Sequence, residues 1–434
     1  MDIWKDSILK MKQINNKYVK IYFLAAFLAC FVLFAIYQKV EHPRSENYVL
    51  GSDPHGYYQY LPAFFLQERE AFEQLPWSKP VGEGRSISVY TCGVAMLQSP
   101  FFLVSHGIAR FIGHDSNGYG PVYYFGVLFS AFFYVWLGIV FLFSVLRRYF
   151  GEKSSIASVM LLFFATNLLY YTLVAPGMSH AYSFFLVSLY IWAVNRFYQV
   201  PDIRSSLLLS FSIALAVLIR PTNVVALIYF FLFDLTKWKE ISVRFRFLVS
   251  RWPLILVMLF VGFLVALPQM AYWHYVTGDW IYYSYLDEGF PNWRTPQIST
   301  VLFGARGGWF LYTPIMLIVS LMLIFFWRKC SCSALAIIIV MVSIIWINGS
   351  WWAPTFSASA GYRALIEYLP FMAFPLGFML ERIMAAKWRS LNIFSFAVAV
   401  LLVFLNIQLM FKYDSTLWWD APWDWNNLLR FFQF

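Results

Sequence analysis

Few side chains in this sequence could do acid–base chemistry, and the first of them is Asp53. It follows an apolar run by about a dozen residues, and a carboxylate held there at a membrane surface could take a proton from an acceptor hydroxyl. The following Pro54 leaves a second interpretation open, because an Asp-Pro pair also commonly caps the start of a helix. His55 could share a metal ion with Asp53, but one Asp-x-His is a weak metal motif.

Three arginines stand at the ends of apolar runs, where a phosphate group could be bound. Arg220 lies between two runs, Arg306 lies in the glycine-rich turn 304–308, and Arg363 directly precedes a run. A guanidinium offers a planar fork of donors that fits phosphate oxygens, and an arginine near the membrane interior is a functional candidate because burying it is costly. The alternative for Arg220 and Arg363 is a side chain that reaches the lipid headgroups beside an aromatic belt.

Other polar and aromatic side chains could bind a substrate. Carboxylates and tyrosine hydroxyls can hydrogen-bond to sugar hydroxyls, and a tryptophan can stack on a sugar ring. A histidine that opens an apolar run, as His180 does, is more often a helix cap than a catalyst. Besides the three arginines, the substrate-binding candidates are His55, Tyr58, His180, Tyr283, Asp287, Glu288, Trp352 and Tyr362.

These residues must be positioned by membrane-spanning helices. Of the 434 residues, 61% are hydrophobic and 12% are charged. A soluble domain carries about 25% charged residues, so a water-soluble enzyme, a disordered chain and a disulfide scaffold are excluded. The four cysteines lack the spacing of zinc or redox motifs. Apolar runs predict an all-α polytopic membrane protein with about eleven transmembrane helices, at 19–39, 121–146, 154–173, 180–199, 204–219, 221–236, 250–272, 308–327, 333–349, 364–383 and 390–412.

The distribution of charge predicts how these helices are oriented. With the N-terminus inside and the C-terminus outside, the inner segments carry about two thirds of the 32 lysines and arginines but only about a third of the 22 acidic residues. The apolar segment 93–112 is left outside, because a span there would reverse every later loop. The net charge of +10 is therefore a topology signal, and no nucleic-acid partner is expected.

One domain is predicted over residues 1–434, without a separate soluble domain. Its first outer loop, about 40–120, is expected to form short amphipathic helices that lie at the membrane surface. The candidate residues gather on the same outer side, which is what transfer from a lipid-phosphate donor needs: cations for the phosphate and one carboxylate for the acceptor. The residues that fall on this side in the charge-derived topology are Asp53, His180, Arg220, Asp287, Arg306 and Arg363.

The arrangement resembles the GT-C glycosyltransferases, integral-membrane enzymes that use polyprenyl-phosphate sugars. It is most similar to bacterial relatives of protein O-mannosyltransferases and of the lipid A aminoarabinose transferase. The resemblance covers nearly the whole chain and is carried by the early aspartate of a long first outer loop, Leu-Ile-Arg-Pro-Thr-Asn at 218–223, Tyr-Thr-Pro at 312–314 and Trp-Trp…Gly-Tyr-Arg-x-Leu at 351–365.

This resemblance implies an inverting transfer of a sugar from a polyprenyl-phosphate donor to a hydroxyl of a glycan, lipid or protein. It implies that Asp53 is the base and that Arg363, with Arg220 or Arg306, binds the lipid phosphate. The site is expected on the outer, periplasmic face of a bacterial cytoplasmic membrane, in contact with membrane lipids. The resemblance makes no cofactor certain, and a divalent metal is left open. Two departures are that Pro54-His55 replaces an acidic pair and that a short tryptophan-rich tail replaces a folded outer domain.

Two other functions remain open from the sequence. A transporter or flippase of a polyprenyl-linked lipid would need polar groups near the bilayer midplane and usually an internal repeat, and no clear repeat is visible. A membrane acyltransferase would use a catalytic histidine such as His180. Loss of turnover in Asp53→Asn with donor binding kept would favour the glycosyltransferase.

Overall fold

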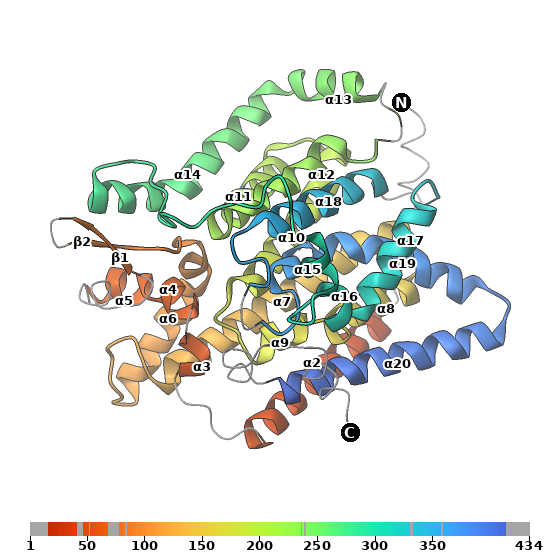
Figure 1. The fold of residues 1–434 in the computed structure, drawn as a ribbon, viewed down its shortest axis with the longest axis horizontal. Coiled ribbons are helices and arrows are strands. Elements are labelled where there is room, and N and C mark those ends of the chain that lie inside the picture. Colours follow the sequence, from red (N-terminus) through yellow and green to blue (C-terminus); the bar gives the residue numbers. More distant parts are fainter. Residues whose placement is uncertain are drawn as a thin grey trace.

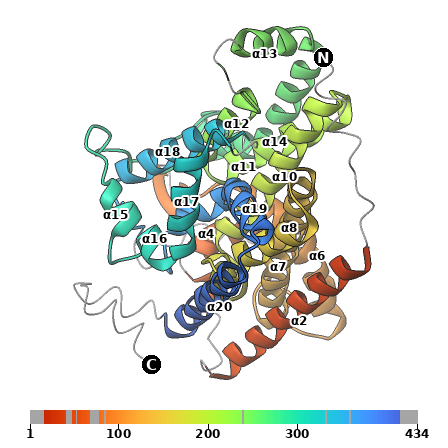
Figure 2. The same ribbon diagram turned by 90° about the vertical axis from the view of Figure 1, so that its right-hand side faces the viewer.

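The computed structural model describes residues 16–40, 47–51, 53–67, 78–82, 85–235, 237, 240–329, 333–356 and 359–413 (Figures 1 and 2). The tryptophan-rich tail considered above lies outside these residues. The helices are α2 (Asn16–Val40), α3 (Asn47–Leu50), α4 (Asp53–Tyr58), α5 (Tyr60–Phe65), α6 (Gly93–Phe111), α7 (Pro121–Tyr149), α8 (Glu152–Phe164), α9 (Leu168–Leu173), α10 (Ser179–Gln199), α11 (Ile203–Ile219), η2 (Pro221–Ala226), α12 (Leu227–Leu232), α13 (Glu240–Val249), α14 (Trp252–Thr277), α15 (Ile298–Phe303), α16 (Trp309–Tyr312), α17 (Pro314–Phe326), α18 (Ala334–Ser350), η3 (Arg363–Tyr368), α19 (Leu369–Ala385) and α20 (Arg389–Lys412); η2 and η3 are 3-10 helices.

The chain is an integral membrane protein built mostly from apolar helices. Four helical stretches of the described residues are long and apolar enough to cross a bilayer, Pro121–Tyr149, Trp252–Thr277, Arg363–Ala385 and Arg389–Lys412. Shorter apolar helices accompany them, among them α11, α17 and α18. The total of eleven spans stays a prediction.

The two ends of the helical body carry different connections. In Figure 1 the turn between α19 and α20, the end of α17 and the amphipathic helix α13 lie toward the right. Helices α4 and α5, with the strands that follow, lie toward the left. These three segments, all predicted to be inside, therefore lie away from the end that carries the first outer loop. Which membrane face each end meets stays a prediction.

The core forms around α10 and α19. Most side chains of α10 are buried on all sides, as expected for a helix surrounded by others. Figure 2 shows α19 in the middle of the molecule, where it packs on α8 and α17. Gly138 of α7 lets α10 approach closely, since a Cβ there would lie 3.0 Å from Phe184 and from the backbone of Phe185. This packing brings the first residues of α10 beside η3.

One predicted span is interrupted at polar residues: the run 154–173 divides into α8 and α9, with Asn167 between them. A second break, between the end of α11 at Ile219 and the start of η2 at Pro221, carries Arg220 and falls between the predicted runs 204–219 and 221–236. The amide of Asn406 donates to the carbonyls of Phe164 and Thr166, so the α8–α9 break keeps its hydrogen bonds. Such breaks are tolerated at membrane depth only where the protein satisfies the freed backbone groups.

The first outer loop contains helices α3 to α6, as predicted, and also a β-hairpin, which the all-α prediction missed. Strand β1 (Ser78–Gly82) pairs antiparallel with β2 (Arg85–Ser88). Gly82 has a φ of 95°, which suits a tight connection and is rarely adopted by other residues. Arg85–Ser88 does not alternate polar and apolar residues, and its last two residues, Ile87 and Ser88, are both buried.

Candidate active site

An ion pair between Asp53 and Arg363 joins the first outer loop to the start of η3. Their closest atoms, Oδ2 of Asp53 and a terminal nitrogen of Arg363, lie 3.2 Å apart. The two side chains are 18% and 17% exposed, so both can still reach a ligand. Asp53 is the first residue of α4, as the Asp-Pro pair predicts, but its carboxylate is directed to a residue 310 positions away.

The loop before Arg363 is held in place by the break between α8 and α9. Asn167 donates its amide to the carbonyl of Ala360 at 3.1 Å. Gly361 has a φ of 70°, and a Cβ there would lie 3.0 Å from Tyr312 and 3.1 Å from the Asn167 amide. Glycine is therefore required at position 361, because both the backbone angle and the space exclude a side chain.

A second charged group lies behind the first and joins three helix ends. One carboxylate oxygen of Glu367 lies 2.9 Å from Nδ1 of His180, and the other lies 3.2 Å from Nε of Arg220. His180 and Glu367 are buried, whereas the Arg220 side chain is 17% exposed. Neither Arg220 nor Arg363 extends to the headgroups, since each is paired with a carboxylate inside the protein.

Three tyrosines surround the Asp53 carboxylate. The rings of Tyr57 and Tyr90 are 4.5 Å apart, and the Tyr57 hydroxyl donates to Ser179 at 3.3 Å. Burial raises the pKa of Tyr57 to about 12, with a smaller contribution from Asp53. Burial and then the Asp53 charge raise the pKa of Tyr90, and burial and Tyr57 raise that of Tyr285. All three phenols therefore stay neutral at physiological pH and can donate hydrogen bonds.

Glu288 and Trp352 form a polar and aromatic rim next to this site. The Trp352 indole donates to Glu288 at 3.2 Å, and the Tyr283 hydroxyl donates to the Glu288 carbonyl at 2.7 Å. Lys79 of β1 lies 3.8 Å from the same carboxylate. Tyr285 connects the rim to the site, because its hydroxyl interacts electrostatically with Arg220, Asp53 and Glu288. Trp352 and Tyr283 are about half exposed, so their rings are open to a ligand.

The other candidates are placed around this cluster or apart from it. Tyr362 is buried, and its hydroxyl donates to the Pro354 carbonyl. Arg306 is half-buried on the turn that packs against the loop before Arg363. Asp287 is exposed.

Two candidates of α4 are turned to a separate core. Tyr58 is buried there, and its hydroxyl donates to the Gly118 carbonyl. The His55 ring packs against Tyr119, and burial lowers the pKa of His55.

The surroundings of Asp53 do not fit a metal ion. A guanidinium occupies one side of its carboxylate, and the His55 ring contacts Tyr119. Across the part of the chain that the structure describes, no three His, Cys, Asp or Glu side chains come together as ligands would. The charged partners in this site are arginines, which favour anions.

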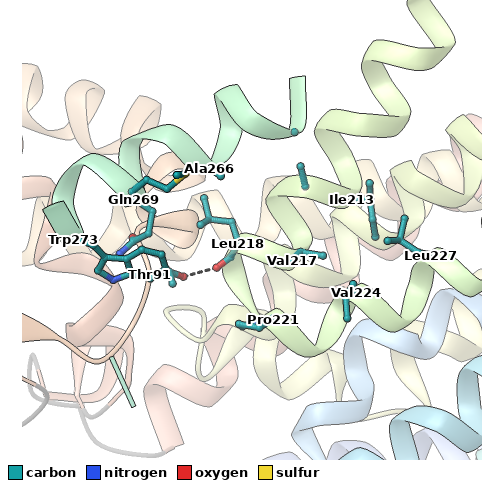
Figure 3. A pocket seen from close by; sticks show the side chains of 13 residues that line it. Thr91, Ile213, Val217, Leu218, Pro221, Val224, Leu227, Ala266, Gln269 and Trp273 are labelled. Atoms are coloured by element: carbon teal, nitrogen blue, oxygen red, sulfur yellow. Dashed lines mark hydrogen bonds between the residues drawn. The ribbon is translucent and has the colours of Figure 1, made fainter. Parts of the chain in front are cut away.

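An apolar groove of about 390 Å³ lies where α11 ends and η2 begins (Figure 3). It lies between α14 and the pair formed by α11 and η2. Leu218 and Pro221, which flank Arg220 closely in sequence, line it, and Thr91 reaches the same wall by donating to the Leu218 carbonyl. The remaining lining residues are Ile213, Ala214, Val217, Val224, Leu227, Gly262, Ala266, Gln269, Met270 and Trp273.

Glu367 is the charged residue of this site that the sequence interpretation missed. It lies inside the predicted span 364–383, where Leu-Ile-Glu-Tyr-Leu-Pro reads as an apolar stretch with one acid. An ionisable residue within a span is itself a functional signal, and that rule could have identified it. Tyr57, Tyr90 and Tyr285 carried no such signal, because the outer loops contain many tyrosines.

Comparisons with known proteins agree with this arrangement at the level of the fold. No family model and no curated protein sequence matches the chain. The crystal structure of ArnT from Cupriavidus metallidurans in the apo state matches with a TM-score of 0.52 and 13% identity, covering 92% of this chain and 71% of ArnT. The Archaeoglobus fulgidus oligosaccharyltransferase in complex with zinc and sulfate matches with a TM-score of 0.52 and 14% identity, covering 89% of this chain.

This chain spans about half the length of the oligosaccharyltransferase, since it covers 53% of that protein. At 13% and 14% identity the likeness shows the fold. The chain has the fold of the GT-C membrane glycosyltransferases, as the sequence motifs predicted.

Proposed function

Starting from the GT-C fold, we propose that this protein is an inverting glycosyltransferase that moves a sugar from a polyprenyl-phosphate donor to an acceptor hydroxyl on a glycan, lipid or protein. The active site is on the outer face of a bacterial cytoplasmic membrane. One observation carries the proposal: Asp53 is paired with Arg363 in a cluster that also holds Arg220, and Leu218 and Pro221, close to Arg220 in the chain, line an apolar groove. A lipid with an anionic phosphate and a long apolar tail fits both features.

Asp53 acts as the general base. The acceptor oxygen attacks the anomeric carbon of the sugar, and its proton passes to the Asp53 carboxylate as the new carbon–oxygen bond forms. The bond from the anomeric carbon to the phosphate oxygen breaks, and its electron pair leaves with polyprenyl phosphate. The phosphate thereby gains one negative charge, which a nearby guanidinium stabilises most in the transition state.

The groove supports a polyprenyl tail as the membrane part of the donor. Its walls are apolar except for Thr91 and Gln269, and it adjoins the helix break that carries Arg220. A polyprenyl tail bound in this groove places its phosphate near the arginines. The tail itself stays in apolar surroundings throughout. Because the tail moves from lipid to an equally apolar groove, the groove contributes through van der Waals packing and shape and not through transfer out of water.

His180 is a poor candidate for the catalytic base of an acyltransferase. It is 1% exposed, and its ring contacts Glu367 and Arg220 on one side and Tyr171 on another. A catalytic histidine must reach its substrate through a hydrogen bond or one water. The Asp53 side chain is 18% exposed and can reach a substrate in this way, whereas His180 cannot.

The test is release of polyprenyl phosphate by purified protein in nanodiscs, supplied with radiolabelled polyprenyl-phosphate sugars and a mixture of acceptors. Wild-type protein is expected to release the free lipid phosphate, and Asp53→Asn is expected to bind the donor without release. A wild-type protein that releases nothing from a panel of such donors would refute the proposal. Release by Asp53→Asn at the wild-type rate would refute the role of Asp53 alone.

A further inference from the structure

Glu367 places a buried negative charge directly behind the active site. It is 1% exposed, at the η3 turn that begins with Arg363 and continues into α19. Its two oxygens are divided between two partners, Nδ1 of His180 at 2.9 Å and Nε of Arg220 at 3.2 Å. A buried carboxylate is costly unless it is paired, so these two contacts explain how the charge is tolerated. The carboxylate does not touch the space around Asp53.

His180 completes this arrangement as a neutral spacer. Nδ1 lies 2.9 Å from the Glu367 carboxylate and 3.1 Å from a terminal nitrogen of Arg220, and Nε2 lies 3.5 Å from the same nitrogen. The ring therefore lies against both the carboxylate and the guanidinium. Glu367 and His180 thus contact the same guanidinium from one side. A positively charged imidazole would instead repel it.

Arg220 needs such support because it stands at a helix break. It ends α11 in an extended conformation and is followed by Pro221. The side chain passes over the Phe356 ring, with the guanidinium carbon 5.6 Å from the ring centre. The cluster lies close to the Asp53 site, because the hydroxyl of Tyr57, on the helix that starts with Asp53, donates to Ser179, the neighbour of His180 in the chain.

We propose that Glu367 and His180 form a clamp that positions Arg220 to bind the phosphate of the lipid donor; this inference rests on the proposed function. Glu367 is a positioning residue, because it acts through Arg220. The clamp holds Nε and one terminal nitrogen from behind, so the remaining donors face the substrate space in a fixed direction. A fixed guanidinium loses less rotamer entropy on binding a phosphate, which raises affinity.

The experiment is a double-mutant cycle on Glu367 and Arg220, with binding of polyprenyl phosphate to protein in nanodiscs as the readout. Glu367→Gln keeps the shape of the side chain and removes its charge. We expect it to weaken lipid binding and raise the KM for the donor about ten- to hundredfold, within the range of coupling between contacting charged residues, with little change in the KM for the acceptor. Arg220→Ala is expected to cause a similar loss, and the double variant is expected to lose no more than Arg220→Ala alone.

Glu381→Gln is the matched control, since Glu381 is at the other end of α19 and accepts from the Gly151 amide and Ser154. It is expected to lower the Tm and leave lipid binding unchanged. If Glu367→Gln fails to fold, Glu367→Asp replaces it in the cycle. Additive losses in the double variant would overturn the clamp. So would a Glu367 variant that keeps wild-type lipid affinity and only lowers the Tm, as Glu381→Gln is expected to do. A wild-type protein that neither binds polyprenyl phosphate nor turns over a donor would overturn the proposed function and the clamp with it.

Discussion

Replacing Asp53 with asparagine tests whether the donor phosphate takes Arg363 from its carboxylate partner. Oδ2 of Asp53 and the guanidinium nitrogen are 3.2 Å apart. A phosphate bound to Arg363 must share or displace that carboxylate, because both anions seek the same donors. In Asp53→Asn the competitor is neutral, so Arg363 is available before the lipid arrives. We therefore expect the variant to bind the donor more tightly than wild type and to turn none of it over.

The size of the effect follows from how exposed this pair is. Two unit charges at this separation attract each other by about 5 kcal/mol at an effective dielectric constant of about 20, and desolvation offsets most of that energy. Exposed pairs contribute about 1 kcal/mol or less, and breaking a buried pair costs about 3–5 kcal/mol. With side chains 18% and 17% exposed, this pair lies between those limits. About 1–3 kcal/mol corresponds to a tightening of roughly five- to 150-fold.

The assay is equilibrium binding of polyprenyl phosphate, and of the intact donor, to protein in nanodiscs at two salt concentrations. Arg363→Ala in the same assay should bind more weakly than wild type, and Asp53→Asn combined with Arg363→Ala should resemble Arg363→Ala alone. The apo Tm of Asp53→Asn should fall, because a partly buried arginine loses its partner, and saturating lipid should restore it. An Asp53→Asn protein that binds the lipid as weakly as wild type, or more weakly, refutes the exchange of anions at Arg363.

Three other predictions concern the arginine, the groove and the buried phenol. Arg363→Lys should lose most of its turnover although the charge is kept, because lysine lacks the forked donors, and wild-type turnover would contradict this. Ala266→Phe should fill part of the groove and raise the KM for a long-chain donor several-fold but not for a short-chain one, whereas Leu259→Phe, on the exposed side of α14, should change neither KM. Tyr57 has a pKa of about 12 in the folded protein, above the usual value near 10. Above about pH 10 its phenol ionises in the unfolded chain but not in the folded one, so the free energy of unfolding should fall as the pH rises further. Tyr57→Phe should therefore lose less Tm between pH 9 and pH 11.5 than wild type does.

The sequence predicts the helical class and the position of the site better than it predicts the contacts inside it. Charge and hydropathy identify apolar helices, and the rule that ionisable residues near spans are functional selects Asp53, Arg220 and Arg363. The pairing of Asp53 with Arg363 is not in the sequence, because it depends on how α4 packs against η3. The same limit applies to Glu367, whose partners lie 147 and 187 positions earlier in the chain.

Local patterns fail where tertiary packing decides the outcome. Tyr58 and His55 stand beside Asp53 in sequence, but helical periodicity turns them to other directions, Tyr58 toward Gly118 and His55 toward Tyr119. The break of the run 154–173 at Asn167 could not be read from hydropathy, because the residues around it are apolar or small. What stabilises the break is an amide on α20, Asn406.

The charge balance of the cluster explains why each of the two arginines is paired with a carboxylate. Asp53 with Arg363, and Glu367 with Arg220, are two neutral pairs when His180 is uncharged. Without lipid, such a cluster can stay folded at the membrane surface, since no buried charge is left uncompensated. The two pairs differ in exposure, because Asp53 is 18% exposed whereas Glu367 is 1% exposed. A phosphate can therefore displace Asp53 from its arginine while Glu367 stays in place. Donor binding then releases the carboxylate that serves as the base, at the point where the leaving group is already held.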